Sequence, residues 1–178
     1  MNNMHGTTIL CVKKGKQLVI ASDGQVTMGD MVCKDTAKKV RSIFNNNTIA
    51  GFAGSVADSL AFISRLESKL EQYSGDLVRS VIELSKDWRS DKYLRNLETS
   101  LLVADKDCIM SLGGNGEALE VDSNIASVGS GSKFALAAAY ALIDTDIEAY
   151  DIVKKSMGIA SKLCVYTNNN LSFETVDL

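Results

Sequence analysis

Two threonines, Thr7 and Thr8, stand near the start of the chain behind six residues that carry no helix signal, apolar run or basic cluster. A threonine hydroxyl becomes an effective nucleophile only when a base removes its proton. The one histidine, His5, lies within those six residues, so the folded body has none for a serine–histidine or cysteine–histidine pair or for a histidine zinc site. If the protein is an enzyme, we expect its general base to be another group.

A free α-amino group could be that base. It titrates near roughly 7.7–8.0, against about 10.4 for a lysine side chain, so a useful fraction is neutral at physiological pH. If residues 1–6 are removed, Thr7 gains such an amine and carries its own base, directly or through a water molecule. We therefore interpret residues 1–6 as a removable leader that masks the amine, and residues 7–178 as a single domain. Thr8 is then an ordinary first residue of a strand.

A second candidate group is the aspartate in the segment SDGQVTMGD at residues 22–30. Taken alone, Asp23 is equally consistent with a turn residue that hydrogen-bonds its own backbone. Lys38 and Lys39 fall on an expected strand, whose alternation sends neighbouring side chains to opposite faces. One of them could face inward, where a buried lysine needs a carboxylate partner, and Asp23 is a candidate. A lysine ammonium near Thr7 would favour the deprotonated hydroxyl and amine.

The glycine-rich segment GSGS at residues 129–132 lies between an expected strand and an alanine-rich helix. Backbone N–H groups at the start of a helix can bind an anion, which leaves a nucleotide-binding module open. Two details argue against it. Phe134 stands where a GxGxxG fingerprint has its last glycine, and no GxxxxGK[ST] motif occurs in the chain. A tight turn without a ligand is the other interpretation.

Hydrophobic periodicity predicts the elements that must position these residues. Strands are expected at residues 7–12, 17–22, 38–44, 48–53, 99–104, 108–112, 117–121, 125–129 and near 171–176, and helices at 55–73, 77–89, 133–143 and 148–163. The order is strands, two helices, strands, two helices and a strand. Such segregated runs favour an α+β fold, a layered sheet sandwich with helices outside, over alternating βαβ units.

Composition limits the classes of function. The chain has 178 residues, of which 46% are apolar and 23% charged, with a net charge of −3, as expected for one soluble globular domain. It has no polybasic tract and no transmembrane-length apolar run, so we expect neither nucleic acid nor membrane as a partner, and a cytoplasmic location. No two cysteines lie close enough for a CxxC pair, and we expect free buried thiols. The cysteines are Cys11, Cys33, Cys108 and Cys164.

Several short motifs together resemble those of one peptidase family. TTILCV, ASDGQVTMG, KKVR, IAGFAGSVAD, KDWRSD, GNGE, VGSGS and CVYTN follow the order and spacing of the bacterial proteasome-related HslV (ClpQ) peptidases, from Thr7 to about Glu174. The resemblance implies the four-layer αββα sandwich of the N-terminal nucleophile (Ntn) hydrolases. It also implies a homo-oligomer of two stacked rings of six subunits, a dodecamer. Its partner would be a hexameric AAA+ ATPase of the HslU type, which binds the ATP and delivers unfolded protein substrates.

The same resemblance implies a role for each matching residue. Thr7 would be the nucleophile, Lys39 the catalytic lysine and Asp23 its acidic partner. Ser130 would lie near the threonine amine, and the N–H of Gly51 would help to form the oxyanion hole. Backbone carbonyls near the CVYT segment would hold a sodium-like monovalent cation, at Ser161, Cys164 and Thr167.

Two other functions would use the same fold. A non-catalytic ring subunit would lack the nucleophile, yet Thr7, Asp23, Lys39 and Ser130 are all present. A small-molecule amidase could use the same N-terminal chemistry, although the motifs between residues 23 and 54 argue against it. We therefore expect a threonine endopeptidase that is the proteolytic subunit of an ATP-dependent two-component protease.

Overall fold

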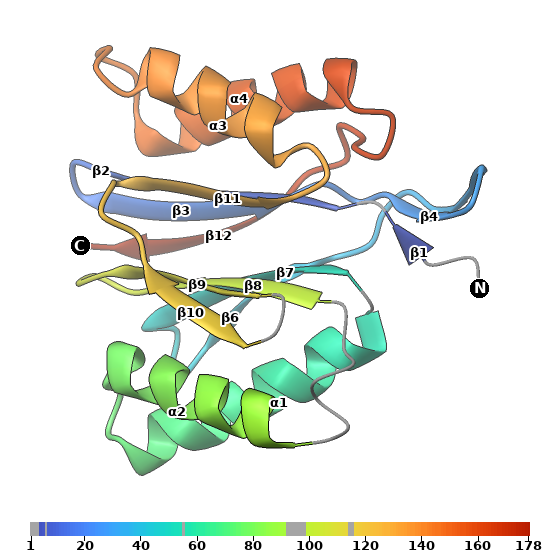
Figure 1. Ribbon diagram of the computed structural model, residues 1–178. Helices are drawn as coiled ribbons and strands as arrows, with labels where there is room; N and C mark the ends of the chain where they lie inside the picture. The colour runs from blue at the N-terminus through green and yellow to red at the C-terminus, as the bar shows by residue number, and fades with distance from the viewer. Residues whose placement is uncertain (1–3, 6, 55, 92–98, 114–115) are drawn as a thin grey trace.

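Two antiparallel β-sheets face each other between two pairs of helices in the computed structural model, which describes residues 4–5, 7–54, 56–91, 99–113 and 116–178 (Figure 1). One sheet has four strands, in the order β11 (Ile125–Gly129), β2 (Thr8–Lys14), β3 (Gln17–Ser22) and β12 (Ser172–Asp177). The other has the order β10 (Glu117–Glu120), β9 (Ile109–Gly113), β8 (Thr99–Ala104), β7 (Thr48–Gly54) and β6 (Val40–Ile43).

Each sheet is covered on its outer face by one helical hairpin. Helices α1 (Val56–Gln72) and α2 (Leu77–Ser90) cover the five-stranded sheet, and α3 (Ser132–Leu142) and α4 (Ala149–Leu163) cover the four-stranded sheet (Figure 1). The expected α+β fold, an αββα sandwich, is confirmed, and these elements begin and end within two residues of their predicted bounds. Among the described residues, no helix is long and apolar enough to cross a membrane.

Three layers of buried side chains hold the sandwich together. Between α1–α2 and its sheet the layer is built from large residues, including Phe62 and Trp88, whose ring centroids are 3.9 Å apart. Between the two sheets lie aliphatic residues and one thiol, Cys11. Between the four-stranded sheet and α3–α4 the layer is rich in alanine. Burial of these apolar surfaces is the main stabilising term of such a fold.

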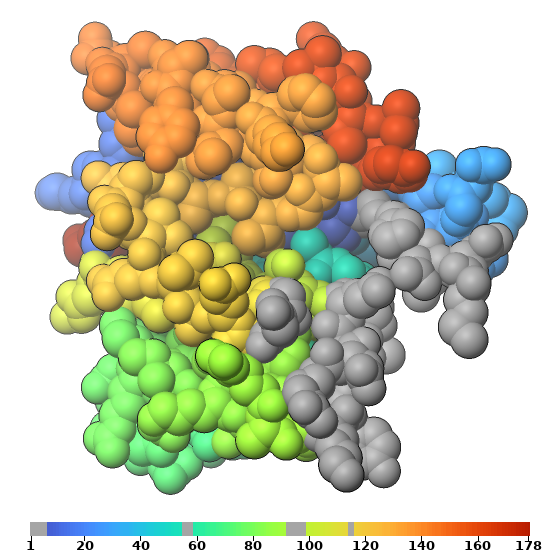
Figure 2. Space-filling model, in the orientation of Figure 1, coloured from blue at the N-terminus to red at the C-terminus, as the bar shows by residue number. Residues whose placement is uncertain are grey.

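A third, small sheet was not expected from the sequence. It pairs β1 (Met4–His5) with β4 (Val26–Met28), and β4 with β5 (Met31–Lys34). Periodicity does not predict it, because β1 and β4 have two and three residues and all four residues of β5 are exposed. The β4–β5 hairpin projects from the side of the molecule, next to the segment that follows α4 (Figure 2).

Candidate active site

Thr7 lies where the start of β2 is next to the end of β11. Thr7 immediately precedes β2, and antiparallel pairing places Gly129 of β11 opposite Thr8. Ser130 follows, and both its N–H (2.8 Å) and its Oγ (3.1 Å) donate to the Thr7 carbonyl. The Thr7 nitrogen in turn donates to Ser130 Oγ at 3.4 Å. This nitrogen is an amide in the chain of 178 residues, and it would be an α-amine only if residues 1–6 were removed.

The close approach of these two segments depends on a glycine. Gly129 has φ +98°, and a Cβ there would lie 2.0 Å from the carbonyl oxygen of Thr7. A side chain at this position would displace the backbone that carries the nucleophile, so only glycine fits.

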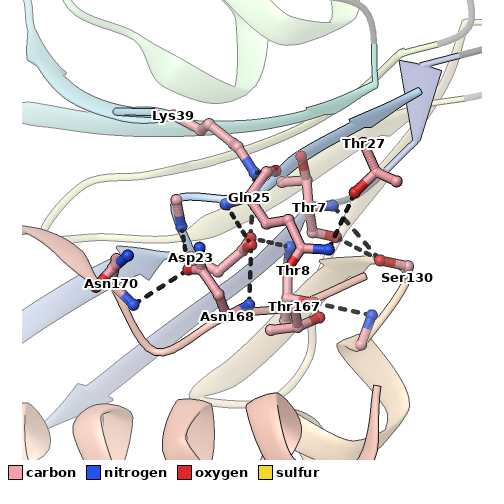
Figure 3. A network of polar contacts seen from close by, with 12 residues as sticks. Thr7, Thr8, Asp23, Gln25, Thr27, Lys39, Ser130, Thr167, Asn168 and Asn170 are labelled. Atoms are coloured by element: carbon pink, nitrogen blue, oxygen red, sulfur yellow. Dashed lines mark hydrogen bonds and ion pairs between the residues drawn. The ribbon is translucent and has the colours of Figure 1, made fainter. Parts of the chain in front are cut away.

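Asp23 and Lys39 form a buried ion pair beside Thr7. Lys39 Nζ lies 3.2 Å from Asp23 Oδ1, with the two side chains 2% and 0% exposed, and it also donates to the carbonyl of Gln25. Burial lowers the pKa of Lys39, and the charge and hydrogen bond of Asp23 oppose that shift. Lys38 is exposed, so the prediction that one of the two lysines faces inward is confirmed. Figure 3 shows Lys39 and Thr7 converging on the same small region.

The carboxylate of Asp23 also fixes the backbone around it. Oδ1 accepts the N–H of Thr8 at 2.7 Å, and Oδ2 accepts the N–H groups of Gln25 (2.9 Å) and Asn168 (3.4 Å). Asp23 is therefore more than a turn residue bonded to its own segment. Its Oδ1 accepts both the N–H of Thr8 and the ammonium of Lys39, which couples the positions of these two groups.

Thr8 is the first residue of β2, as expected, but its side chain does more than that of an ordinary strand residue. Its side chain is fully buried; Oγ1 lies 2.7 Å from Oγ1 of Thr167 and accepts the N–H of Gly131 at 2.8 Å. Thr8 thus ties β2 to the start of α3 and to the segment after α4. The signal in the sequence was a hydroxyl at the buried end of an apolar strand, where it needs partners.

The GSGS loop is used internally. The N–H of Ser130 donates to the Thr7 carbonyl and the N–H of Gly131 to Thr8 Oγ1. These two backbone donors just before α3 are thus bonded to Thr7 and Thr8, which favours the tight-turn interpretation over a nucleotide site.

The sequence did not indicate the contacts that the side chains of Gln25 and Thr27 make near the site. Gln25 is buried, and its Nε2 donates to Thr27 Oγ1 (3.0 Å) and to the carbonyl of Val165 (2.9 Å). This links β4 to the segment after α4, so the hairpin and the end of the helix are held as one unit. A glutamine in a polar loop gave no sequence signal for such a contact.

Gly51 lies within the five-stranded sheet and not at its edge. The N–H of the next residue, Phe52, donates to the carbonyl of Lys39 on the β6 side at 3.0 Å. Antiparallel alternation turns the Gly51 N–H the other way, toward Leu102 of β8, its partner in register. A Cβ at Gly51 would lie 2.6 Å from Cγ2 of Ile9, so the glycine serves the packing of the two sheets. The structure therefore does not bring this amide to Thr7.

Ser161, Cys164 and Thr167 surround the C-terminal end of α4. Ser161 is in the last turn, Cys164 caps the helix, and the N–H of Thr167 donates to the Cys164 carbonyl at 3.1 Å. A helix end presents unpaired carbonyl oxygens with partial negative charge, and such oxygens suit hard cations. Main-chain carbonyls of these three residues could therefore hold a cation.

The thiols take no part in this arrangement. All four cysteines are free, with Cys11 and Cys164 buried as expected, whereas Cys108 is half-buried and Cys33 exposed on β5. The expectation of burial is wrong for Cys33, because the small sheet that carries it has no layer above it. Burial raises the pKa of Cys11 to about 12, which keeps that thiol protonated and inert.

Known proteins were compared with the chain. Residues 3–176 match the family model for proteasome subunits. The chain is 54% identical to the ATP-dependent protease subunit HslV of Rickettsia bellii and 53% identical to that of Rickettsia typhi, over 97% of this chain and 96% of each relative. The crystal structure of eukaryotic HslV from Trypanosoma brucei superposes with a TM-score of 0.92 at 39% identity, covering 96% of this chain and 99% of that one. Thiobacillus denitrificans BPH shares the fold, with a TM-score of 0.73 at 19% identity.

Proposed function

The chain belongs to the proteasome family, within the HslV subunits of ATP-dependent proteases, and we propose that Thr7 is its nucleophile and that the freed α-amine of Thr7 is its general base. It is a threonine-type endopeptidase. The observation that carries the residue assignment is the position of Thr7, between Ser130 on one side and the buried Asp23–Lys39 pair on the other. Thr7 Oγ attacks the peptide carbonyl, an acyl-enzyme ester forms, and water releases the second product.

Each neighbour has a distinct task in this proposal. The ammonium of Lys39 favours the ionised hydroxyl and the neutral amine by its charge. Asp23 holds that ammonium and, through the Thr8 amide, the backbone of the nucleophile. Ser130 Oγ accepts from the Thr7 nitrogen and so orients the amine.

The leader blocks this machinery in two ways. It converts the base into an amide, and its residues Met4 and His5 pair with Met28 and Thr27 of β4. Removal of residues 1–6 frees the amine and at the same time opens the edge of β4. An extended substrate can then add to that edge by main-chain hydrogen bonds, which accept many sequences.

Oxyanion stabilisation is expected from the end of β7. Gly54 is exposed, has φ +118°, and its N–H points to the same side as that of Phe52 but beyond the start of β6. Ala53, just before it, lies against Gly129, which in turn contacts Thr7. We assign the donor role to Gly54 in place of Gly51. A preorganised donor of this kind lowers the activation barrier by about 3 kcal/mol.

Assembly and location complete the proposal. The relatives are named as subunits of ATP-dependent proteases, and a double ring of six subunits with a hexameric HslU-type ATPase fits a chain that has no ATP motif of its own. A cation at Ser161, Cys164 and Thr167 would neutralise the carbonyls at the end of α4 and hold the segment that contacts Thr8. A cytoplasmic location is supported by four free thiols, which a reducing compartment maintains.

Thr7→Ala tests the mechanism. We expect peptide hydrolysis to fall to background, because no other residue can supply both the hydroxyl and its adjoining amine. Thr8→Ser, which keeps its hydroxyl, is the control and should retain most activity. Intact mass should show that the active protein begins at Thr7. Full hydrolysis by Thr7→Ala, or activity in protein that still begins at Met1, would contradict the proposal and indicate a different active site.

A further inference from the structure

The segment that follows α4 carries an asparagine in contact with both loops of the ion pair. Asn168 Oδ1 accepts the N–H of Gly24 at 3.0 Å, and its Nδ2 donates to the carbonyl of Asp35 at 2.8 Å. Gly24 is the residue after Asp23, and Asp35 lies four residues before Lys39. The side chain of Asn168 therefore bridges the segment that follows Asp23 and the segment that precedes Lys39.

A second asparagine and the backbone reinforce this bridge. Asn170 donates from Nδ2 to the same Asp35 carbonyl at 2.9 Å, and its N–H donates to Asn168 Oδ1 at 3.1 Å. The N–H of Asn168 also donates to Asp23 Oδ2. We call Asn168, Asn170 and their partner Asp35 the asparagine clasp.

The backbone around Gly24 is closely packed. A Cβ at Gly24 would lie 2.3 Å from the Asp35 carbonyl oxygen and 3.0 Å from that of Asn170. The N–H of Ala37 donates to the Gly24 carbonyl at 2.9 Å, which ties the approach to Lys39 to the same glycine. Any shift of the clasp therefore moves the two loops relative to each other.

We propose that Asn168 is a positioning residue for the proposed reaction, which sets the geometry of the Asp23–Lys39 pair at Thr7 by holding the Gly24 and Asp35 segments together. The proposal rests on the proposed function. Asparagine suits the task because it offers an acceptor to two N–H groups and a donor to a carbonyl, all from one planar group. An aspartate would keep the acceptors and lose the donor, and an alanine would lose both.

The test compares Asn168→Ala with Asn169→Ala, an exposed neighbour outside the clasp. Both are made in the full chain, and peptide hydrolysis is expressed per mature N-terminus determined by intact mass. A displacement near 1 Å costs about 10²-fold in rate, so we expect Asn168→Ala to lower kcat by about 10- to 100-fold with KM within about threefold. Asn169→Ala should match the unmodified protein in both constants.

A pH profile separates positioning from simple loss of structure. If Asn168→Ala lets the Lys39 ammonium move away from Thr7, the amine of Thr7 keeps its proton to higher pH. The acid limb of kcat/KM should therefore move to higher pH, by about half a unit, and because alanine adds no charge the shift reports the displaced ammonium. A merely structural role would leave the profile in place.

The outcomes are distinct from those for the function itself. Retention of kcat within about threefold in Asn168→Ala, or a loss that only follows the loss of folded protein, overturns the positioning role. If Asn168→Ala does not fold, Asn168→Asp, which loses the donor to Asp35, is measured in its place, and a kcat within about threefold of the unmodified protein overturns the role. Activity retained by Thr7→Ala would instead refute the proposed function, whatever Asn168 does.

Discussion

The two helix–sheet halves of the sandwich differ in the size of the side chains buried between helices and sheet. The α1–α2 half packs large side chains such as Phe62, Leu66 and Trp88 against its sheet, with ion pairs such as Lys69–Asp87 (2.9 Å) across the helix surface. The α3–α4 half packs small ones, including Ala135, Ala139, Ala149 and Ala160. Both are apolar, and the second carries most of the polar network around Thr7, to which the five-stranded sheet contributes Lys39, just before β6.

This difference teaches why the site lies where it does. Small side chains let a helix approach a sheet closely, so backbone groups at its end come within hydrogen-bond distance of the strands. The start of α3 reaches Thr8 in this way, through the N–H of Gly131 at 2.8 Å. The large residues of the α1–α2 half contribute mainly to stability, and the small residues of the α3–α4 half let the start of α3 contact Thr8. Changes in the first half should lower stability, and changes near the second should lower activity.

The largest effect should follow from Lys39→Met. It removes the ammonium near Thr7, and groups that assist proton transfer typically contribute about 10²–10⁴-fold to the rate. It also leaves the buried Asp23 carboxylate without its cation, although that group keeps the N–H groups of Thr8 and Gln25. Steady-state hydrolysis and denaturant unfolding measure both consequences.

Lys38→Met is the matched control, because that lysine is exposed and adjacent. It should change neither rate nor stability. Equal losses of hydrolysis rate in Lys39→Met and Lys38→Met would mean that Lys39 contributes only general positive charge and has no specific role at Thr7.

Trp88→Ala tests whether the α1–α2 half contributes to stability alone. Trp88 is fully buried in the α1–α2 half, and large-to-small changes of this kind cost about 3–5 kcal/mol of unfolding free energy. The kcat per folded molecule should stay unchanged. Trp88→Phe should be much milder, because the indole Nε1 makes no hydrogen bond in the described part of the chain. A large fall in kcat at full folding would show that the halves are not separate in function.

Thr8→Val sharpens the role of the second threonine. The change keeps the shape but removes the hydroxyl that accepts from Gly131 and contacts Thr167. A buried N–H without a partner costs about 1–3 kcal/mol, and we expect this loss in denaturant unfolding together with a moderate fall in kcat. Thr8→Ser should restore both. No change in stability would mean that another group replaces the hydroxyl.

Much of this could be predicted from sequence, because the main elements are long and periodic. Strands such as 17–22 and 125–129 were placed correctly, since each is a short, largely apolar run bounded by polar or glycine-containing turns. The Asp23–Lys39 pair could also be predicted, because alternation sends two adjacent lysines to opposite faces and a buried charge needs a partner.

The rest depended on contacts between segments far apart in the chain. The partners of Thr8 include Thr167, and those of Gly24 include Asn168, each more than a hundred residues away. Strand β4 is stabilised by its neighbours and not by its own pattern. The Gly51 assignment failed for a related reason: a glycine in a motif indicates close approach, but not whether a ligand or another sheet approaches it.

The smallest predicted effect concerns the layer between the two sheets, which both halves share. The pKa of the buried Cys11 thiol is raised from 9.0 to about 12 by its burial. Between these values the unfolded thiol loses its proton and the folded one keeps it, so the contribution to stability is complete below pH 9 and declines as pH rises. At pH 10 the decline should be about 1.4 kcal/mol relative to neutral pH. Denaturant unfolding of the unmodified protein and Cys11→Ala at pH 8 and 10 isolates this decline, since the change in Cys108, whose pKa burial also raises, is common to both. Parallel pH dependence in the two proteins would show that the thiol is not sealed between the sheets and that the shared layer admits water.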